Sequence, residues 1–216
     1  MRYQKKRIYE WSSNLAYIVG LISSDGCLSK DGRHIDLTSK DEEQLTNFCE
    51  ALGRNLPIST KPNGHGDTAY RVQFSDVALY DFLNSSGLTP HKSFTMPALK
   101  IPDRYFVDFL RGNFDGDGSV YGFVDTRWRS SFMYYVCFVS ASRTFIEYLE
   151  QKICSICGVG SKSINQAGSI YKIAYAKKDA AILFQKMYYS KDIVALSRKR
   201  RKLEGYINGG RDDILL

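Results

Sequence analysis

The sequence predicts an α+β protein made of two similar repeats, each reading helix, strand, strand, helix, strand, strand, helix. Two observations lead to this prediction. An apolar run that ends in an acid and a glycine occurs twice, as LAYIVGLISSDG at 15–26 and as FLRGNFDGDG at 109–118. The hydrophobic patterns that follow the two runs also come in the same order, which indicates an internal repeat.

The first repeat has its elements in short, well-separated segments. Its first run is followed by two short alternating stretches within 27–39, a helical pattern over 41–53, an alternating strand at 69–75 and a helix over 76–87. The helical pattern stops at Gly53, and glycine commonly follows the last turn of a helix. The remaining turn-rich residues before the strand at 69–75 supply the third strand of this half.

The second repeat follows the same order over a longer segment. Alternating stretches at 119–124 and 130–140 precede a helical pattern over 142–158, and strands at 161–166 and 170–176 precede a helix over 178–189. Residues 125–131 lengthen its first hairpin. The joint lies at 94–105, where two prolines suit a surface connection. We therefore expect an N-terminal repeat over 1–97 and a C-terminal repeat over 98–216.

Charge and hydropathy narrow the range of partners and locations. The chain has 30 Lys and Arg against 23 Asp and Glu, a net charge of +7, which favours a polyanionic partner. No apolar run approaches the roughly 20 residues that span a bilayer, and the N-terminus lacks the apolar segment of a signal peptide. We expect an intracellular protein with no membrane partner.

The two apolar runs carry small residues at helical spacing. Ala16, Gly20 and Ser24 lie four apart, as do Gly112 and Gly116, so each helix has a small face. Small faces let two helix backbones approach closely, which predicts that these two helices pack against each other.

This packing would place Asp25 and Asp117 side by side at two helix C-termini. The location is unfavourable, because helix C-termini are electronegative and the carboxylates repel each other. A divalent cation between them would remove the conflict, and Mg²⁺ suits two carboxylates with a substrate phosphate. The alternative is ordinary Asp-Gly turn chemistry, but two occurrences in register with a repeat favour the metal.

These two runs resemble the signature helices of LAGLIDADG homing endonucleases in their single-chain, two-repeat form, over about residues 12–205. The resemblance implies an αββαββα fold in each half, with four-stranded antiparallel sheets forming a DNA-binding saddle. It also implies that Asp25 and Asp117 bind the catalytic metal, with the backbone carbonyls of Ser24 and Gly116 as further ligands. The implied cofactor is Mg²⁺, and Mn²⁺ or Ca²⁺ could occupy the same sites.

The resemblance further implies a catalytic lysine near each acid. Lys92, in LTPHKS, and Lys199, in ALSRKR, match these positions. Lys199 has basic neighbours that are rivals for the role, namely Arg198, Arg200, Arg201 and Lys202. Ser39 and Ser140 match positions that order water, and both side chains are short enough that they would act through solvent.

Alternation along the strands predicts which side chains face DNA, since outward residues of such strands are polar. The candidates on or beside strands are Ser29, Arg33, His34, Asp36, Arg71, Gln73, Ser75, Ser161, Lys162, Ser163, Asn165 and Lys172. Lys61 in a loop, Arg127 and Arg129 at the hairpin tip, and Tyr121, whose outward register the pattern leaves open, complete the set.

Together these features predict a site-specific endonuclease that breaks double-stranded DNA by metal-dependent phosphodiester hydrolysis. It would act as a monomer without an obligate protein partner. Two alternatives share the fold: an RNA maturase, and a DNA-binding protein that does not cut. A third is an unrelated two-repeat α/β domain. Both motif acids are present, which favours the enzyme.

Overall fold

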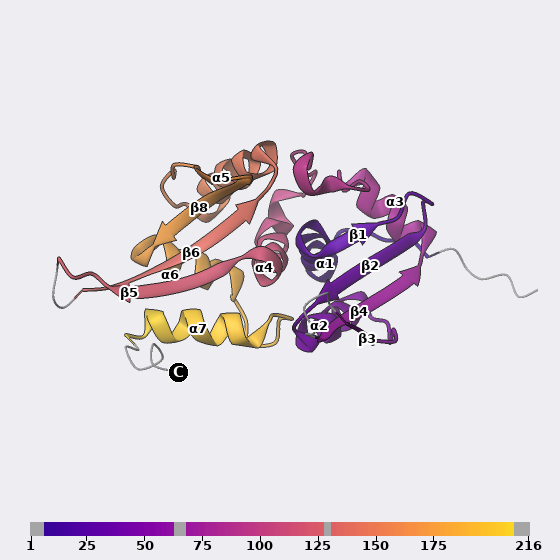
Figure 1. Ribbon diagram of the computed structural model, residues 1–216, viewed down its shortest axis with the longest axis horizontal. Coiled ribbons are helices and arrows are strands. Elements are labelled where there is room, and N and C mark those ends of the chain that lie inside the picture. The colour runs from indigo at the N-terminus through magenta and orange to yellow at the C-terminus, as the bar shows by residue number, and fades with distance from the viewer. Residues whose placement is uncertain (1–6, 63–67, 128–130, 210–216) are drawn as a thin grey trace, which may run out of the picture.

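The computed structural model describes residues 7–62, 68–127 and 131–209 (Figure 1). The first half contains α1 (Ser13–Ser24), β1 (Gly26–Leu28), β2 (His34–Ser39), α2 (Glu42–Leu52), β3 (Ser59–Pro62), β4 (Thr68–Ser75) and α3 (Val77–Ser85). The second half contains α4 (Phe106–Asp117), β5 (Ser119–Val124), β6 (Phe132–Ser140), α5 (Arg143–Cys157), β7 (Asn165–Ala167), β8 (Ile170–Ala176), α6 (Lys177–Met187) and α7 (Ser197–Ile207). Two 3-10 turns, Lys92–Phe94 and Asp103–Tyr105, lie between the halves.

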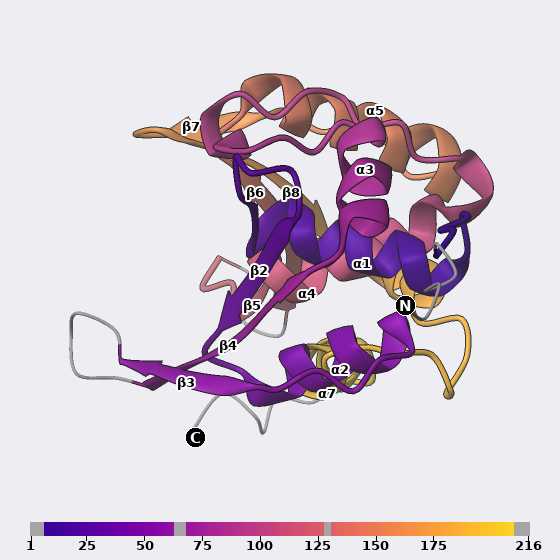
Figure 2. The same ribbon diagram turned by 90° about the vertical axis from the view of Figure 1, so that its right-hand side faces the viewer.

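Each half forms one four-stranded antiparallel sheet, and the two sheets have the same strand order. These orders are β1-β2-β4-β3 and β5-β6-β8-β7. Figure 1 shows the sheets on either side of a central helix pair, α1 and α4, and Figure 2, turned by 90°, shows the other helices around this pair. The predicted fold class, α+β with two αββαββα repeats, is confirmed.

Local sequence signals set the helix boundaries. Ser12 caps α1 by accepting a hydrogen bond from the backbone N–H of Leu15, and Ser142 caps α5 in the same way through Phe145. α2 and α5 each end at a glycine in the left-handed region, with φ of 64° at Gly53 and 72° at Gly158. These ends hold α2 and α5 to the lengths that the sequence predicts.

The sheet in the second half differs from the prediction at residues 161–164, which form no strand. Glu150 in α5 accepts hydrogen bonds from the Ser161 hydroxyl (2.7 Å) and from the backbone N–H of Lys162 (2.9 Å). Because that N–H is used by a helix side chain, it does not donate to a strand partner. β7 therefore starts only at Asn165.

α7 is an additional helix beyond the seven elements of the repeat. It packs against β5 and α6, and its Tyr206 ring contacts Phe132 and Tyr134 of β6. Within the described residues, no helix is both long enough and apolar enough to cross a membrane.

Candidate active site

α1 and α4 approach so closely that only glycine fits at their crossing. A side-chain methyl on Gly20 would lie 2.2 Å from the backbone oxygen of Phe109, and one on Gly112 would lie 2.1 Å from the backbone oxygen of Tyr17. Both distances are far inside van der Waals contact, and backbone atoms cannot rotate away. The predicted contact between the small faces is therefore present.

The same approach brings the two acids to one place. A methyl on Gly116 would lie 1.9 Å from the Ser24 hydroxyl and 3.1 Å from the Asp25 Oδ2. The Asp25 carboxylate thus lies against the last turn of α4, one residue before Asp117. The side chain of Ser24 folds back onto its own helix, donating to the backbone oxygen of Leu21 (3.0 Å).

Both carboxyl groups have raised pKa values. Burial is the main cause of the raised pKa of Asp25, which is half-buried. Asp117 is more exposed, yet loss of surrounding water is again the first cause of its raised pKa, and the Asp25 carboxylate is the second. Repulsion between the two carboxylates favours cation binding at this place.

A buried lysine stands beside each acid in an equivalent position. The Lys92 ammonium donates to the backbone oxygen of Gly26 (2.5 Å), and the Lys199 ammonium donates to that of Gly118 (2.6 Å). Gly26 and Gly118 each follow one motif acid directly. Both lysines act to lower the pKa values of both acids. Each motif acid is therefore followed by a glycine whose backbone oxygen accepts from a buried lysine.

Lys199 makes three additional contacts at the end of α4. Its ammonium also lies 2.7 Å from the backbone oxygen of Phe114, 2.8 Å from that of Asp115 and 2.7 Å from that of Gly116. It thereby caps the electronegative end of α4. Burial lowers the pKa of Lys199 to about 8. The Gly116 carbonyl, a predicted metal ligand, already accepts one hydrogen bond and retains one lone pair for a metal.

The structure separates Lys199 from its basic neighbours. The others are engaged elsewhere: Arg198 with Asp41, Arg200 with the backbone oxygens of Ser190 and Lys191, Arg201 with Ser197, and Lys202 over the Tyr206 ring. Of these five residues, Lys199 is the one whose side chain binds the end of α4.

Gln44 in α2 is a site residue that the sequence patterns did not predict. Its amide donates to the Asp25 carboxylate (2.6 Å), and its amide oxygen accepts from the Ser39 hydroxyl (3.0 Å). Ser39 therefore reaches Asp25 through a side chain rather than through solvent. Gln44 is 1% exposed and lies four residues before the buried Phe48, on the apolar face of α2. A polar residue on that face was the sequence feature that could have indicated a buried hydrogen bond.

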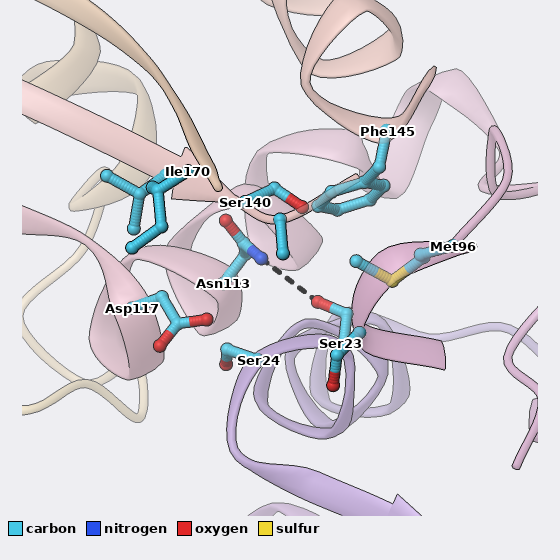
Figure 3. A pocket seen from close by; sticks show the side chains of 11 residues that line it. Ser23, Ser24, Met96, Asn113, Asp117, Ser140, Phe145 and Ile170 are labelled. Atoms are coloured by element: carbon cyan, nitrogen blue, oxygen red, sulfur yellow. Dashed lines mark hydrogen bonds between the residues drawn. The ribbon is translucent and has the colours of Figure 1, made fainter. Parts of the chain in front are cut away.

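At the position that corresponds to Gln44, the second half has an apolar residue. The residue three positions after the N-cap is Gln44 in α2 but Phe145 in α5, which has no hydrogen-bonding group. A pocket of about 220 Å³ lies here beside Asp117 (Figure 3). In it the Asn113 amide donates to the Ser23 hydroxyl (3.0 Å), while its oxygen has no hydrogen-bond partner among the described residues. Ser140 also lines this pocket.

Solved structures match this arrangement over most of the chain, although no protein-family model and no curated protein matches the sequence. The homing endonuclease I-WcaI bound to its DNA recognition sequence matches with a TM-score of 0.60 and 13% identity, over 89% of this chain and 86% of that one. The LAGLIDADG meganuclease I-AabMI bound to uncleaved DNA matches with a TM-score of 0.58 and 16% identity, over 91% and 90%. The protein has the LAGLIDADG fold.

The same fold also occurs in another class of protein. The N-terminal LAGLIDADG domain of DUF199/WhiA matches with a TM-score of 0.56 and 14% identity, over 86% of each chain. These TM-scores lie close together. The likeness therefore establishes the fold of this chain, and its activity has to be argued from the site residues.

On the first LAGLIDADG sheet, the predicted DNA-facing side chains share the face away from the core. His34 and Asp36 alternate with the fully buried Ile35 and Leu37. On β4 the predicted residues Arg71, Gln73 and Ser75 pair with β2 across this face, and Asp36 forms an ion pair with Arg71. Ser29 and Arg33 lie at the β1–β2 turn, and Lys61 lies on β3.

On the second LAGLIDADG sheet, the outcome is divided. Tyr121, Asn165 and Lys172 lie on the outer face, and Arg127 pairs with Asp125 beside the hairpin tip. Arg129 lies outside the described residues. Ser163 is exposed just before β7.

Ser161 and Lys162, also expected to face DNA, lie outside the strands of the second sheet. Both contact Glu150 of α5, and the Lys162 ammonium forms an ion pair with Asp179 of α6 (2.6 Å). These contacts turn the segment towards the helices, because the carboxylates there attract its donors.

Proposed function

We propose that the protein is a site-specific endodeoxyribonuclease that makes a double-strand break in DNA by metal-dependent hydrolysis. One observation carries the proposal: Asp25 and Asp117 converge at the ends of two closely packed helices, and each has a buried lysine at the adjacent glycine. Two acid–lysine pairs related by pseudo-symmetry match the two antiparallel strands of a duplex. Each pair serves one scissile phosphate.

The donor set suits Mg²⁺. The described residues contain no cluster of three or more His, Cys, Asp or Glu side chains that would hold a metal alone. The site instead offers two carboxylates and the carbonyls of Ser24 and Gly116, and Mg²⁺ readily completes such a shell with water and phosphate oxygens. When bound, the metal would activate a water for attack and stabilise the leaving oxygen. Mn²⁺ and Ca²⁺ have the same preference for oxygen ligands, and an I-DmoI complex with target DNA was obtained with Mn.

The chain's own residues act by binding and orienting. The lysine ammonium groups lie where they would offset negative charge on the scissile phosphate. Gln44 fixes the orientation of the Asp25 carboxylate. A single chain supplies both acids and both sheets, so we propose a monomer that needs no protein partner.

The test begins with selection of cleaved molecules from a randomised duplex library in Mg²⁺. We expect double-strand breaks at one long sequence, abolished by EDTA. Asp25→Asn and Asp117→Asn should each bind the selected duplex and fail to cut it. Normal cutting by either variant would show that the site assignment is wrong.

The likeness to the DUF199/WhiA domain keeps a second candidate, a DNA-binding protein that does not cut. Tight binding of a selected duplex without cutting in Mg²⁺ or Mn²⁺ would support it. An RNA maturase would instead bind intron RNA and restore splicing even in the Asp25→Asn, Asp117→Asn double variant.

A further inference from the structure

The outer faces of the two sheets differ in chemistry. On the first sheet this face carries His34, Asp36, Arg71, Gln73 and Ser75, all polar or charged. On the second sheet it carries a group that we call the aromatic face, consisting of Tyr121, Phe123, Met133 and Tyr135. Ile170 lies on the same side of this sheet, at the other end of β8.

Strand register places the aromatic face opposite the core. Tyr121 pairs with Tyr135 and Phe123 pairs with Met133 across β5 and β6. The alternate residues Val120 and Val136 are buried on the other side, where the helices pack. Phe123 is 44% exposed and Ile170 is 47% exposed, so large apolar side chains lie on the surface.

The rings of the aromatic face stack on one another. The Tyr121 and Tyr135 centroids are 5.2 Å apart with planes at 17°, and Phe123 lies 6.1 Å from Tyr135 at 11°. The Lys172 ammonium lies 4.6 Å from the Tyr121 centroid. Because the ring faces are turned to each other, the ring edges remain for a partner. That arrangement suits small apolar groups better than unpaired bases, which need open ring faces on which to stack.

We propose that, in the endonuclease proposed above, the aromatic face reads thymine methyl groups in the major groove, so that one half-site of the target is rich in thymine. The thymine C5 methyl is the apolar group that base edges present in that groove, and aromatic side chains contact it. Duplex DNA is the occupant because the face belongs to the same pseudo-symmetric pair of sheets as the polar one. Lys172 and Asn165 lie on the same face to meet phosphates and base edges.

The experiment replaces thymine by deoxyuridine in the selected target, one half-site at a time, and measures binding in Ca²⁺, without cutting. This exchange removes only the methyl group. We expect each contacted position under the second sheet to lose about fourfold in affinity, which corresponds to about 0.8 kcal/mol for one buried methyl-sized group. The other half-site should change little.

Two variants assign the effect to the sheets. Phe123→Ser should remove most of the deoxyuridine penalty, because the apolar contact is already gone. The matched control, Gln73→Ser on the first sheet, should keep the penalty and relax base preference only in the other half-site. The deoxyuridine series on the unaltered protein needs neither variant and stands if one of them does not fold.

The outcomes separate the two proposals. A selected half-site without thymine enrichment, or equal affinity for thymine and deoxyuridine, overturns the reading of methyl groups while leaving the endonuclease in place. A protein that binds RNA but no duplex overturns both. Docking of a protein partner on the aromatic face, with DNA binding unaffected by Phe123→Ser, also overturns this inference.

Discussion

In the proposed endonuclease, replacing Gln44 by Met should give a variant that nicks instead of cutting both strands. The Gln44 amide donates to the Asp25 carboxylate at 2.6 Å, whereas the corresponding position in α5 is the apolar Phe145. A hydrogen bond to a charged group contributes roughly 1.5–3 kcal/mol. Its loss should raise the pKa of Asp25, and at about 1.36 kcal/mol per tenfold change it should slow the step that depends on this carboxylate roughly 10- to 100-fold. Burial already raises this pKa, and Gln44 opposes that effect.

The direction of the effect on cutting follows because the ionised Asp25 carboxylate, and not the neutral acid, would bind the metal. A higher pKa means that Asp25 becomes a carboxylate only at higher pH, so the acidic limb of the cleavage profile should move to higher pH. At a fixed pH on that limb, the strand served by Asp25 should be cut roughly 10- to 100-fold more slowly, while the other strand is cut as before.

A supercoiled plasmid carrying the selected target makes this visible, since a single cut gives an open circle and a double cut gives a linear product. Phe145→Leu is the matched control, because Phe145 holds the corresponding position in α5 and contributes no hydrogen bond through its side chain. The Phe145→Leu variant should not accumulate the nicked plasmid. Equal slowing of both strands by Gln44→Met, or an unmoved acidic limb, would refute the reasoning.

Three further changes test the helix crossing and the charges around it. Gly20→Ala should lower the free energy of unfolding by about 1–3 kcal/mol, since overpacking against the Phe109 carbonyl outweighs the roughly 1 kcal/mol gained in helix propensity. Gly160→Ala is the control: its methyl would lie at an ordinary contact distance of 3.7 Å from the Lys162 ammonium, and the free energy of unfolding should change little in denaturant titrations. Asp117→Asn should raise the melting temperature of the metal-free protein at pH 7, because the pKa of Asp117 is higher in the folded state than in the unfolded state and ionisation therefore disfavours folding. The gain in melting temperature should disappear once the pH falls below the unfolded pKa. A gain that persists there would contradict this cause. Lys199→Met should lose cutting. Its difference from wild type in the free energy of unfolding should widen by roughly 3 kcal/mol between pH 8 and 10.5, because the pKa of Lys199 falls from 10.5 to about 8 on folding and only wild type gains stability as the pH rises through that window. A flat difference would show that the lysine keeps its ordinary pKa.

The element order and the helix crossing could be predicted from the sequence because both depend on local periodicity. Small residues four apart define one face of a helix wherever the helix lies, so the amino-acid pattern alone predicts that the faces bearing Gly20 and Gly112 meet. The contact of Gln44 with Asp25 depends instead on how α2 docks against β2, which no local pattern encodes. The identity of Lys199 among five basic residues depends on the rotation of α7, which the charge run leaves open.

The rotation of α7 is set largely by buried charges on α4. Arg111 is 1% exposed and donates to the backbone oxygens of Val194 (3.0 Å) and Met187 (2.9 Å). Its guanidinium also pairs with Asp108 at 2.9 Å, one turn earlier. A buried ion pair stabilises the fold only if its remaining donors are satisfied, and here the last residue of α6 and the α6–α7 connection supply the acceptors. This connection is therefore tied to α4 rather than free to follow α6.

Asp115 of α4 makes a further connection, to the start of α7. Its carboxylate accepts from the backbone N–H of Leu196 (2.8 Å) and from the Tyr17 hydroxyl of α1 (2.8 Å). Leu196 is the N-cap of α7, so Lys199 stands one turn beyond a point fixed to α4. The helix that carries Asp117 thus also positions the lysine that neutralises it, and a shift of α4 would move the acid and its cation together. This positioning role explains the burial of three charged residues at helical spacing in an apolar run, Asp108, Arg111 and Asp115, although desolvating them costs free energy.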